Sequence, residues 1–293
     1  MPSAELHAVP TPPTAVATMR PGDEVSGVFA CTRKDRLTAR TGTPYLALEL
    51  RDRSGAIPAR VFRDADLLAG RFEQGDLVRI AGRVERFRDA LQVEVRAIAR
   101  ADDADPAAFL PVAFRDLDEL DGFLEHLAQE VRDPPFAALL ADLLGDKALR
   151  TALRRTPCTR AGHHAYLGGL LEHTVAVATL ALETCTLHPR LDQNLLLTAA
   201  IVHDLGKTRE FTLGAEIGLT DEGRMLGHVE LGLRLLDERA APLDEPRRLA
   251  LAHCVLTHHG DRRPATPEAL ALQRLNAVDA AVKGALEHGI TGP

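Results

Sequence analysis

The spacing of apolar residues changes once along this chain. Up to about residue 100, apolar and polar residues alternate in short runs such as "YLALEL" (45–50) and "LQVEVRAI" (91–98). Beyond about residue 110, apolar residues recur three and four positions apart, as in "LDELDGFLEHLAQEV" (117–131). Alternation is typical of half-buried strands, and the longer period is typical of amphipathic helices. The sequence therefore predicts two parts, an all-β domain followed by an all-α helical bundle.

The first part is expected to contain five strands and one short helix. The strands cover residues 23–34, 45–50, 57–62, 75–84 and 91–98, with a helical segment at 63–72. Leu46, Leu48 and Leu50 share one face of the second strand, and "DRSG" (52–55) predicts the turn that follows it. Five short strands with a helix after the third are typical of a Greek-key barrel of the OB type. We therefore predict an OB-type barrel over residues 18–100.

The remaining segments complete a multidomain layout. Residues 1–17 are rich in proline and are predicted to be a disordered tail. The stretch "ADDADPAAF" (101–109) is acidic, small and broken by proline, which indicates a linker. Helical periodicity then predicts a helical connection over residues 110–160 and a helical domain over 161–290.

Charge is distributed unevenly between these two parts. The whole chain carries a net charge of −7, but residues 20–100 hold 16 Lys and Arg against 12 Asp and Glu. OB barrels bind single strands through a basic groove and aromatic rings on which bases stack. Each phenylalanine of the barrel is equally compatible with its core. The candidate strand-binding residues are Phe29, Arg33, Lys34, Arg36, Tyr45, Arg60, Phe62 and Phe87.

Other features narrow the class of protein. The four cysteines are far apart and form no CxxC pair, which argues against a disulfide framework or a zinc–thiolate site. The N-terminus has no basic region followed by an apolar stretch, and no apolar run approaches a membrane span. We therefore expect a cytoplasmic protein with no membrane partner; the sequence indicates no oligomeric state.

Histidines gather in the helical part, where ten of the twelve lie between His163 and His288. A single helical histidine is more often a satisfied polar residue than a ligand. Here, however, imidazoles and a carboxylate recur at the ends of successive amphipathic helices. Burying them together would be unfavourable without a bound cation, and nitrogen and oxygen donors suit Mn²⁺, Fe²⁺, Mg²⁺ or Zn²⁺. The candidate metal ligands are His173, His203, Asp204, His228, His258, His259, Asn276 and Asp279.

Several motifs carry a resemblance to a known family. "HHAYLGGLLEHT" (163–174) and "HDLGK" (203–207) resemble the HD phosphohydrolase superfamily, as do "LTDEGRMLGHVELG" (219–232) and "THHG" (257–260). Together with the barrel they look like the YhaM-type 3′–5′ exoribonucleases, which join an OB-type domain to an HD domain. The resemblance covers nearly all of residues 18–288.

The resemblance implies a two-ion site and a role for each residue. Asp204 would bridge two divalent ions, for which Mn²⁺ is the first expectation. The first ion would be held by His173 and His203, and the second by His228, His258 and His259. Lys207 would steady the phosphate, with an exposed lysine at a helix end as the alternative. His163 and His164 would contact substrate, or would form only the turn that enters the helix.

One position departs from the family. The superfamily has an aspartate ligand on the last helix, whereas this chain has Asn276 there and Asp279 one turn later. Asn276 could ligate through its carbonyl oxygen, Asp279 could replace it, or the first ion could bind weakly. The sequence leaves these three alternatives open.

The leading hypothesis is a metal-dependent 3′–5′ exonuclease that hydrolyses single-stranded RNA to nucleoside 5′-monophosphates, with single-stranded DNA as a further substrate. A second hypothesis is a phosphohydrolase acting on a small nucleotide. A third is a nucleic-acid-binding protein with an impaired HD site, for which Asn276 is the only support. An exonuclease needs both the barrel and the metal cluster, which is why we place it first.

Overall fold

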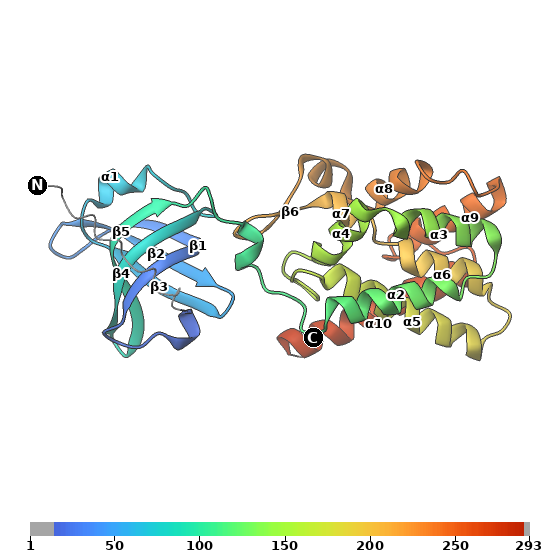
Figure 1. Cartoon of the computed structure of the whole chain (residues 1–293), viewed down its shortest axis with the longest axis horizontal. Helices are drawn as coiled ribbons and strands as arrows, with labels where there is room; N and C mark the ends of the chain where they lie inside the picture. The colour runs from blue at the N-terminus through green and yellow to red at the C-terminus, as the bar shows by residue number, and fades with distance from the viewer. Residues whose placement is uncertain (1–14, 290–293) are drawn as a thin grey trace, which may run out of the picture. The chain divides into compact units, whose positions relative to one another are not determined.

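The structure, a computed structural model, describes residues 15–289. The chain divides into two compact units (Figure 1). The first contains the chain up to Leu110 together with Leu213–Glu216, and the second contains Pro111–Thr212 and the chain from Ile217 onward. The first is a β barrel and the second is mainly helical, so the change of hydrophobic period correctly predicted two different kinds of domain.

The first unit is a closed five-stranded barrel in the order β1-β2-β3-β5-β4. Its strands are β1 (Glu24–Thr38), β2 (Pro44–Asp52), β3 (Gly55–Val61), β4 (Leu77–Phe87) and β5 (Ala90–Arg100). Helix α1 (Ala65–Ala69) follows β3, and a parallel pairing of β3 with β5 closes the barrel. The predicted OB-type barrel, with its helix after the third strand, is confirmed.

Alternating burial explains why these segments form strands. Leu46, Leu48 and Leu50 of β2 are all buried, and the intervening Glu49 is exposed. The long strand β1 pairs with β4 through its first half and with β2 through its second. Its register shifts between Cys31 and Arg33, a bulge that lets one strand bend between two partners.

Short 3₁₀-helices flank the barrel. The predicted disordered tail falls mostly on residues 1–14, outside the described residues, but Val16–Thr18 form η1. The Val16 amide donates to Asp52 Oδ2 at 2.8 Å, which holds η1 against the turn after β2. The predicted linker (101–109) ends in η2 (Pro106–Phe109).

Within residues 111–289 the second unit contains nine helices, and all of them except α7 contribute side chains to one core. These are α2 (Leu117–Gln129), α3 (Pro134–Gly145), α4 (Lys147–Arg155), α5 (Gly169–Leu187), α6 (Gln193–Val202), α7 (Lys207–Glu210), α8 (Asp221–Asp237), α9 (Glu245–Thr257) and α10 (Pro267–His288). Side chains of α2–α4 such as Leu120, Leu139 and Leu153 share that core with α5 and α6. The segment 110–160 is therefore part of the helical unit's core.

Two features of the helical unit differ from the prediction. A small hairpin, β6 (Phe211–Leu213) and β7 (Ile217–Leu219), interrupts the helices, so the expectation of an all-α second half is wrong there. The expectation that no segment is long and apolar enough to cross a membrane is also wrong by length and composition. Among the described helices α5 meets both criteria, with 19 residues, but 56% of it is buried, as in core helices.

Candidate functional site

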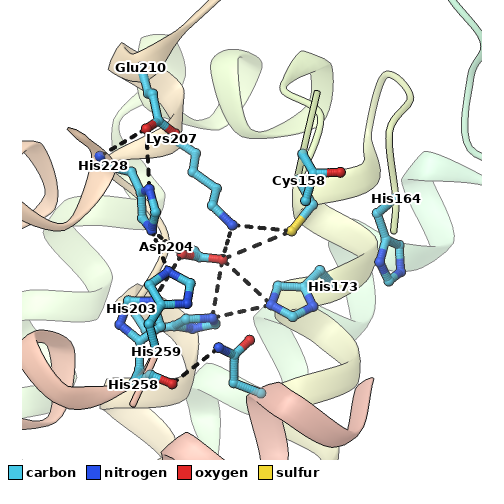
Figure 2. Close-up of polar contacts among 12 residues, drawn as sticks. Cys158, His164, His173, His203, Asp204, Lys207, Glu210, His228, His258 and His259 are labelled. Carbon is cyan, nitrogen blue, oxygen red and sulfur yellow. Dashed lines mark hydrogen bonds and ion pairs between the residues drawn. The ribbon is translucent and has the colours of Figure 1, made fainter. Parts of the chain in front are cut away.

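Helix ends bring five functional side chains together in the helical unit (Figure 2). His173 lies in the second turn of α5, and His203 and Asp204 directly follow α6. Gly227 has φ 72°, which breaks α8, so His228 begins a new helical segment. His258 follows the last residue of α9. Side chains far apart in the sequence therefore meet because each sits where a helix begins or ends.

The Asp204 carboxylate lies at the centre of this cluster, and its two oxygens face different histidines. Oδ2 lies 3.3 Å from His203 Nε2 and 3.5 Å from His173 Nε2. Oδ1 lies 3.4 Å from His258 Nε2 and 3.5 Å from His228 Nε2. A carboxylate that presents one oxygen to each of two imidazole pairs has the arrangement of a bridging ligand.

The hydrogen bonds of the first pair fix its tautomers. His203 Nδ1 lies 2.9 Å from the Ala200 carbonyl oxygen, and His173 Nδ1 lies 2.6 Å from Asp279 Oδ2. Both partners are acceptors, so each Nδ1 is placed to donate and each ring directs its Nε2 toward Asp204. The two Nε2 atoms also lie 3.3 Å apart. Two ring nitrogens held this close to each other and to one carboxylate oxygen are placed to share a cation.

The second pair follows the same rule. His258 Nδ1 lies 2.6 Å from the Val255 carbonyl oxygen, and His228 Nδ1 lies 3.3 Å from Glu210 Oε1. Each ring again directs Nε2 toward Asp204. His259 Nε2 lies 2.7 Å from His228 Nε2 and completes this group. Metal-ligating histidines characteristically donate their other nitrogen to such a carbonyl or carboxylate.

This donor set fits divalent cations. Burial lowers the pKa of His258, and burial also lowers the pKa of His259 to about 3, so both rings are neutral. His258 Nε2 and Asp204 Oδ1 are fully buried and have no hydrogen-bond partner among the described residues. Leaving such atoms unsatisfied is unfavourable, and a cation would satisfy both. Each of two groups, His173–His203–Asp204 and Asp204–His228–His258–His259, keeps its donor atoms within 4.8 Å of one another.

Lys207 is buried beside Asp204, so the alternative of an exposed lysine is wrong. Its Nζ donates to Asp204 Oδ2 at 2.6 Å and lies 3.4 Å from Cys158 Sγ. Burial alone would raise the pKa of Asp204, but Lys207 and His203 hold that pKa well below its usual range. Burial raises the pKa of Cys158 to about 12, so it is a neutral thiol. The centre is therefore an ionised carboxylate with one buried ammonium.

Asn276 and Asp279 occupy different places. The Asp279 carboxylate bonds to His173 Nδ1, the nitrogen that points away from Asp204. Its pKa is lowered because the hydrogen bond to His173 outweighs the effect of burial, which would raise it. Asn276 Nδ2 donates to the His258 carbonyl oxygen at 3.4 Å. Asp279 thus orients a histidine of the first group, and Asn276 lies beside a histidine of the second.

His163 and His164, both predicted to contact substrate, differ in exposure. His164 is 1% exposed, and its ring packs against those of Tyr166 and His173, so the predicted substrate contact is wrong for this residue. The His164 carbonyl also leaves no room beside Gly169, where a Cβ would approach its oxygen to 2.2 Å. His163 is half-buried and lines a hollow beside the metal cluster, so it remains a candidate.

The role of Asp279 gives a testable prediction. Removing a carboxylate that orients a metal-ligating histidine typically lowers metal affinity by roughly 10- to 100-fold. We expect Asp279→Ala to weaken Mn²⁺ binding by that factor, measured by calorimetric titration. Asp261→Ala, which changes an exposed carboxylate just beyond Gly260, should leave the affinity unchanged. Equal affinities of the two variants would contradict the positioning role.

The barrel presents a separate candidate surface. A hollow of about 200 Å³ lies over β1, β2 and β3 and is lined by Arg33 and Arg60 together with Asp35 and Glu49; Arg33 pairs with Asp35 at 2.7 Å. The rings of Tyr45 and Phe62, at the ends of β2 and β3, lie 5.5 Å apart, and Phe62 is 45% exposed. Phe87 is also exposed but lies at the end of β4. Arg33 and Arg60 on these strands are the candidates for binding an oligonucleotide.

The predicted contact with a nucleic-acid strand is wrong for Phe29 and Lys34, and an ion pair restrains the side chain of Arg36. Phe29 is 2% exposed and belongs to the barrel core. Lys34 Nζ donates to the carbonyls of Ala69 and Phe72, so its charge caps the end of the α1 segment. Arg36 is exposed but pairs with Asp66 at 2.7 Å.

Sequence reasoning missed Glu210 and Cys158. Glu210 accepts from the His228 backbone amide at 3.1 Å and also faces its ring, which fixes the start of the second part of α8. Cys158 lies in the loop after α4 and contacts Lys207. Neither belongs to a motif with recognisable spacing. Only the folded arrangement shows their position.

Comparisons with known proteins agree with this architecture. The family model of the HD domain matches residues 170–281, and that of the OB-fold nucleic acid binding domain matches residues 28–99. The "3'-5' exoribonuclease YhaM" of Halalkalibacterium halodurans is 27% identical over 270 residues, covering 88% of this chain and 84% of that protein. The protein of the same name from Bacillus subtilis is also 27% identical, covering 88% of this chain and 85% of its own length.

Among solved structures, the second OB-fold domain of replication protein A from Methanococcus maripaludis is 16% identical, with a TM-score of 0.26. It covers 31% of this chain and 97% of its own, a similarity too low to support an inference. The two family models and the similarity along most of the chain indicate the same order of domains. The chain therefore contains an OB-fold nucleic acid binding domain followed by an HD domain, and along most of its length it is similar to proteins named "3'-5' exoribonuclease YhaM".

Proposed function

We propose that this protein is a metal-dependent 3′–5′ exonuclease that hydrolyses single-stranded RNA to nucleoside 5′-monophosphates. The observation that carries the proposal is the set of four histidine Nε2 atoms directed at the Asp204 carboxylate. The direction of hydrolysis and the RNA substrate are taken from the relatives named "3'-5' exoribonuclease YhaM". DNA is a further candidate substrate, because stacking on aromatic side chains does not depend on the sugar.

The proposed ligands divide into two groups that share Asp204. His173 and His203 would hold one divalent ion with Asp204 Oδ2. His228, His258 and His259 would hold a second with Oδ1. Mn²⁺ is the proposed ion, since nitrogen and oxygen donors without sulfur suit it. When bound, two such ions neutralise the charge on a phosphodiester and make an attacking water more acidic.

The chain's own residues supply positioning and charge. Asp279 and Glu210 each keep a histidine in the tautomer that points its lone pair inward. Lys207 contributes a fixed positive charge beside Asp204, where it can attract a phosphate oxygen. The rings of His173, His203 and His258 are buried, and the exclusion of water from these three strengthens their electrostatic contacts.

The barrel groove would hold the strand. Arg33 and Arg60 would contact phosphates while Tyr45, Phe62 and Phe87 stack on bases. We expect Arg33→Ala/Arg60→Ala to weaken single-stranded RNA binding about tenfold and to reduce the salt slope by about 1.4, at roughly 0.7 per phosphate contact. Fluorescence anisotropy at several salt concentrations measures both. Lys34→Ala should leave the slope unchanged, because Lys34 is already bonded within the barrel.

The proposed activity is tested with end-labelled RNA. Single-stranded RNA labelled at its 5′ end is incubated with the protein and Mn²⁺ or with chelator, and the products are separated over time. The proposal expects a ladder that shortens from the 3′ end only when Mn²⁺ is present. Intact RNA that still binds the protein would instead support a binding protein without hydrolytic activity. Internal fragments from the start would contradict the exonuclease.

A further inference from the structure

A second feature of the helical unit adjoins the metal cluster. A hollow of about 220 Å³ opens there between the end of α9 and one face of α10. The face contributes residues at the spacing i, i+3, i+4 and i+7, namely Gln273, Asn276, Ala277 and Ala280. Lys207, His258 and His259 also line the hollow, so it is continuous with the cluster.

The charge of this hollow is unusual for the chain. The helical part carries most of the acidic excess of a protein with net charge −7, yet no carboxylate lines the hollow. Its lining includes two permanent cations, Lys207 and Arg274, and three histidines. A wall without acidic groups, beside a site for a phosphodiester, favours an anion.

Arg274 is the cation that remains available. Lys207 Nζ is bonded to Asp204. Arg274 is exposed, and no hydrogen bond or ion pair joins it to another residue in the range 15–289. Some other arginines of this unit are instead held by carboxylates, as Arg150 is by Asp121 and Arg247 by Asp133. A free guanidinium presents a fork of donors that matches two phosphate oxygens.

We propose that Arg274 binds the phosphodiester that adjoins the scissile one, and so forms a second phosphate subsite. This inference rests on the proposed function. Arg274 lines the same hollow as Asn276 and His258, and Asn276 contacts the His258 carbonyl at the cluster. A strand whose scissile phosphate lies at the cluster therefore presents its next phosphate within reach of Arg274. The subsite makes a trinucleotide a better substrate than a dinucleotide, because a dinucleotide has only one phosphodiester.

The subsite is tested by removing either partner of the contact. Steady-state kinetics are measured for a ribodinucleotide, for a trinucleotide, and for a trinucleotide whose 5′-side linkage is a neutral methylphosphonate. For Arg274→Ala we expect the KM of the trinucleotide to rise about tenfold, at similar kcat, since one charge-assisted contact is lost. For the dinucleotide and for the methylphosphonate trinucleotide, the KM of Arg274→Ala should equal that of the wild type. Arg274→Lys should recover part of the loss.

A matched control and a binding readout separate the possible outcomes. Arg190→Ala removes the same charge from an exposed site just beyond the C-terminal end of α5, and it should leave the KM of all three substrates unchanged. If Arg274→Ala raised the KM of the dinucleotide and the trinucleotide equally, or raised neither, the proposed subsite would be overturned. Trinucleotide affinity measured with chelator present is expected to fall in Arg274→Ala as well. Unchanged affinity there would overturn the subsite even if the wild type hydrolysed no RNA, an outcome that would separately contradict the proposed function.

Discussion

Replacing Asp204 with alanine is expected to reduce RNA hydrolysis by about a thousandfold or more while single-stranded RNA binding stays nearly unchanged. The side chain presents one oxygen to each of two histidine pairs, so its loss removes a donor from both proposed ions. The barrel groove proposed to bind RNA contains no residue of this cluster, and its affinity for RNA therefore should not depend on Asp204. Initial rates with labelled RNA and anisotropy titrations measure the two quantities separately.

The Asp204 experiment needs a control for folding. Asp204→Ala leaves Lys207 buried without its partner, and breaking a buried ion pair typically destabilises by about 3–5 kcal/mol. Asp204→Asn keeps an oxygen that can accept a hydrogen bond from Lys207. Its free energy of unfolding is therefore expected to lie closer to that of the wild type, while the variant remains inactive. Asp261→Ala, which changes an exposed carboxylate, should retain full activity. Wild-type turnover in a folded Asp204→Asn protein would refute the central role of this carboxylate.

Replacing Gly206 with alanine is expected to destabilise the helical unit by about 3 kcal/mol or more. The φ of Gly206 is −59°, which any residue adopts, so backbone strain is not the reason. A Cβ at this position would lie 1.9 Å from the His228 carbonyl oxygen and 2.4 Å from the Gly232 amide nitrogen. Both are backbone atoms of α8, so the whole helix has to move. His228 moves with it, and hydrolysis should fall together with stability.

Gly122 provides the matched control for this prediction. It lies within α2, is exposed, and a Cβ there would meet no atom within 4 Å. Gly122→Ala is therefore expected to stabilise by roughly 0.5–1 kcal/mol. Urea unfolding followed by circular dichroism measures both variants. A Gly206→Ala protein as stable as wild type would show that the start of α7 and α8 are less tightly packed than the structure indicates.

The sequence predicted those parts of the protein that depend on local pattern. Alternating residues placed Leu46, Leu48 and Leu50 correctly inside the barrel. Histidines at helix ends were predicted to meet, and His173, His203 and His258 do surround Asp204. In both cases the periodicity of one element determines which way its side chains point.

Other features depend on contacts that no local pattern contains. Phe29, Ala30 and Cys31 are buried in succession beside the bulge of β1, so alternation could not show that Phe29 faces the core. Lys34 is tied to α1 by carbonyls more than thirty residues away. Asp279 was considered as a metal ligand because of its spacing from Asn276, but its position behind His173 depends on how α5 and α10 pack.

The proposed mechanism requires that one carboxylate and five histidines hold two divalent ions. Native mass spectrometry of protein loaded with Mn²⁺ tests this requirement, because it counts bound ions without requiring activity. We expect two ions in the wild type, one in His228→Ala, which keeps the His173–His203–Asp204 group, and none in Asp204→Ala. Two ions retained by Asp204→Ala, or none bound by the wild type, would contradict it.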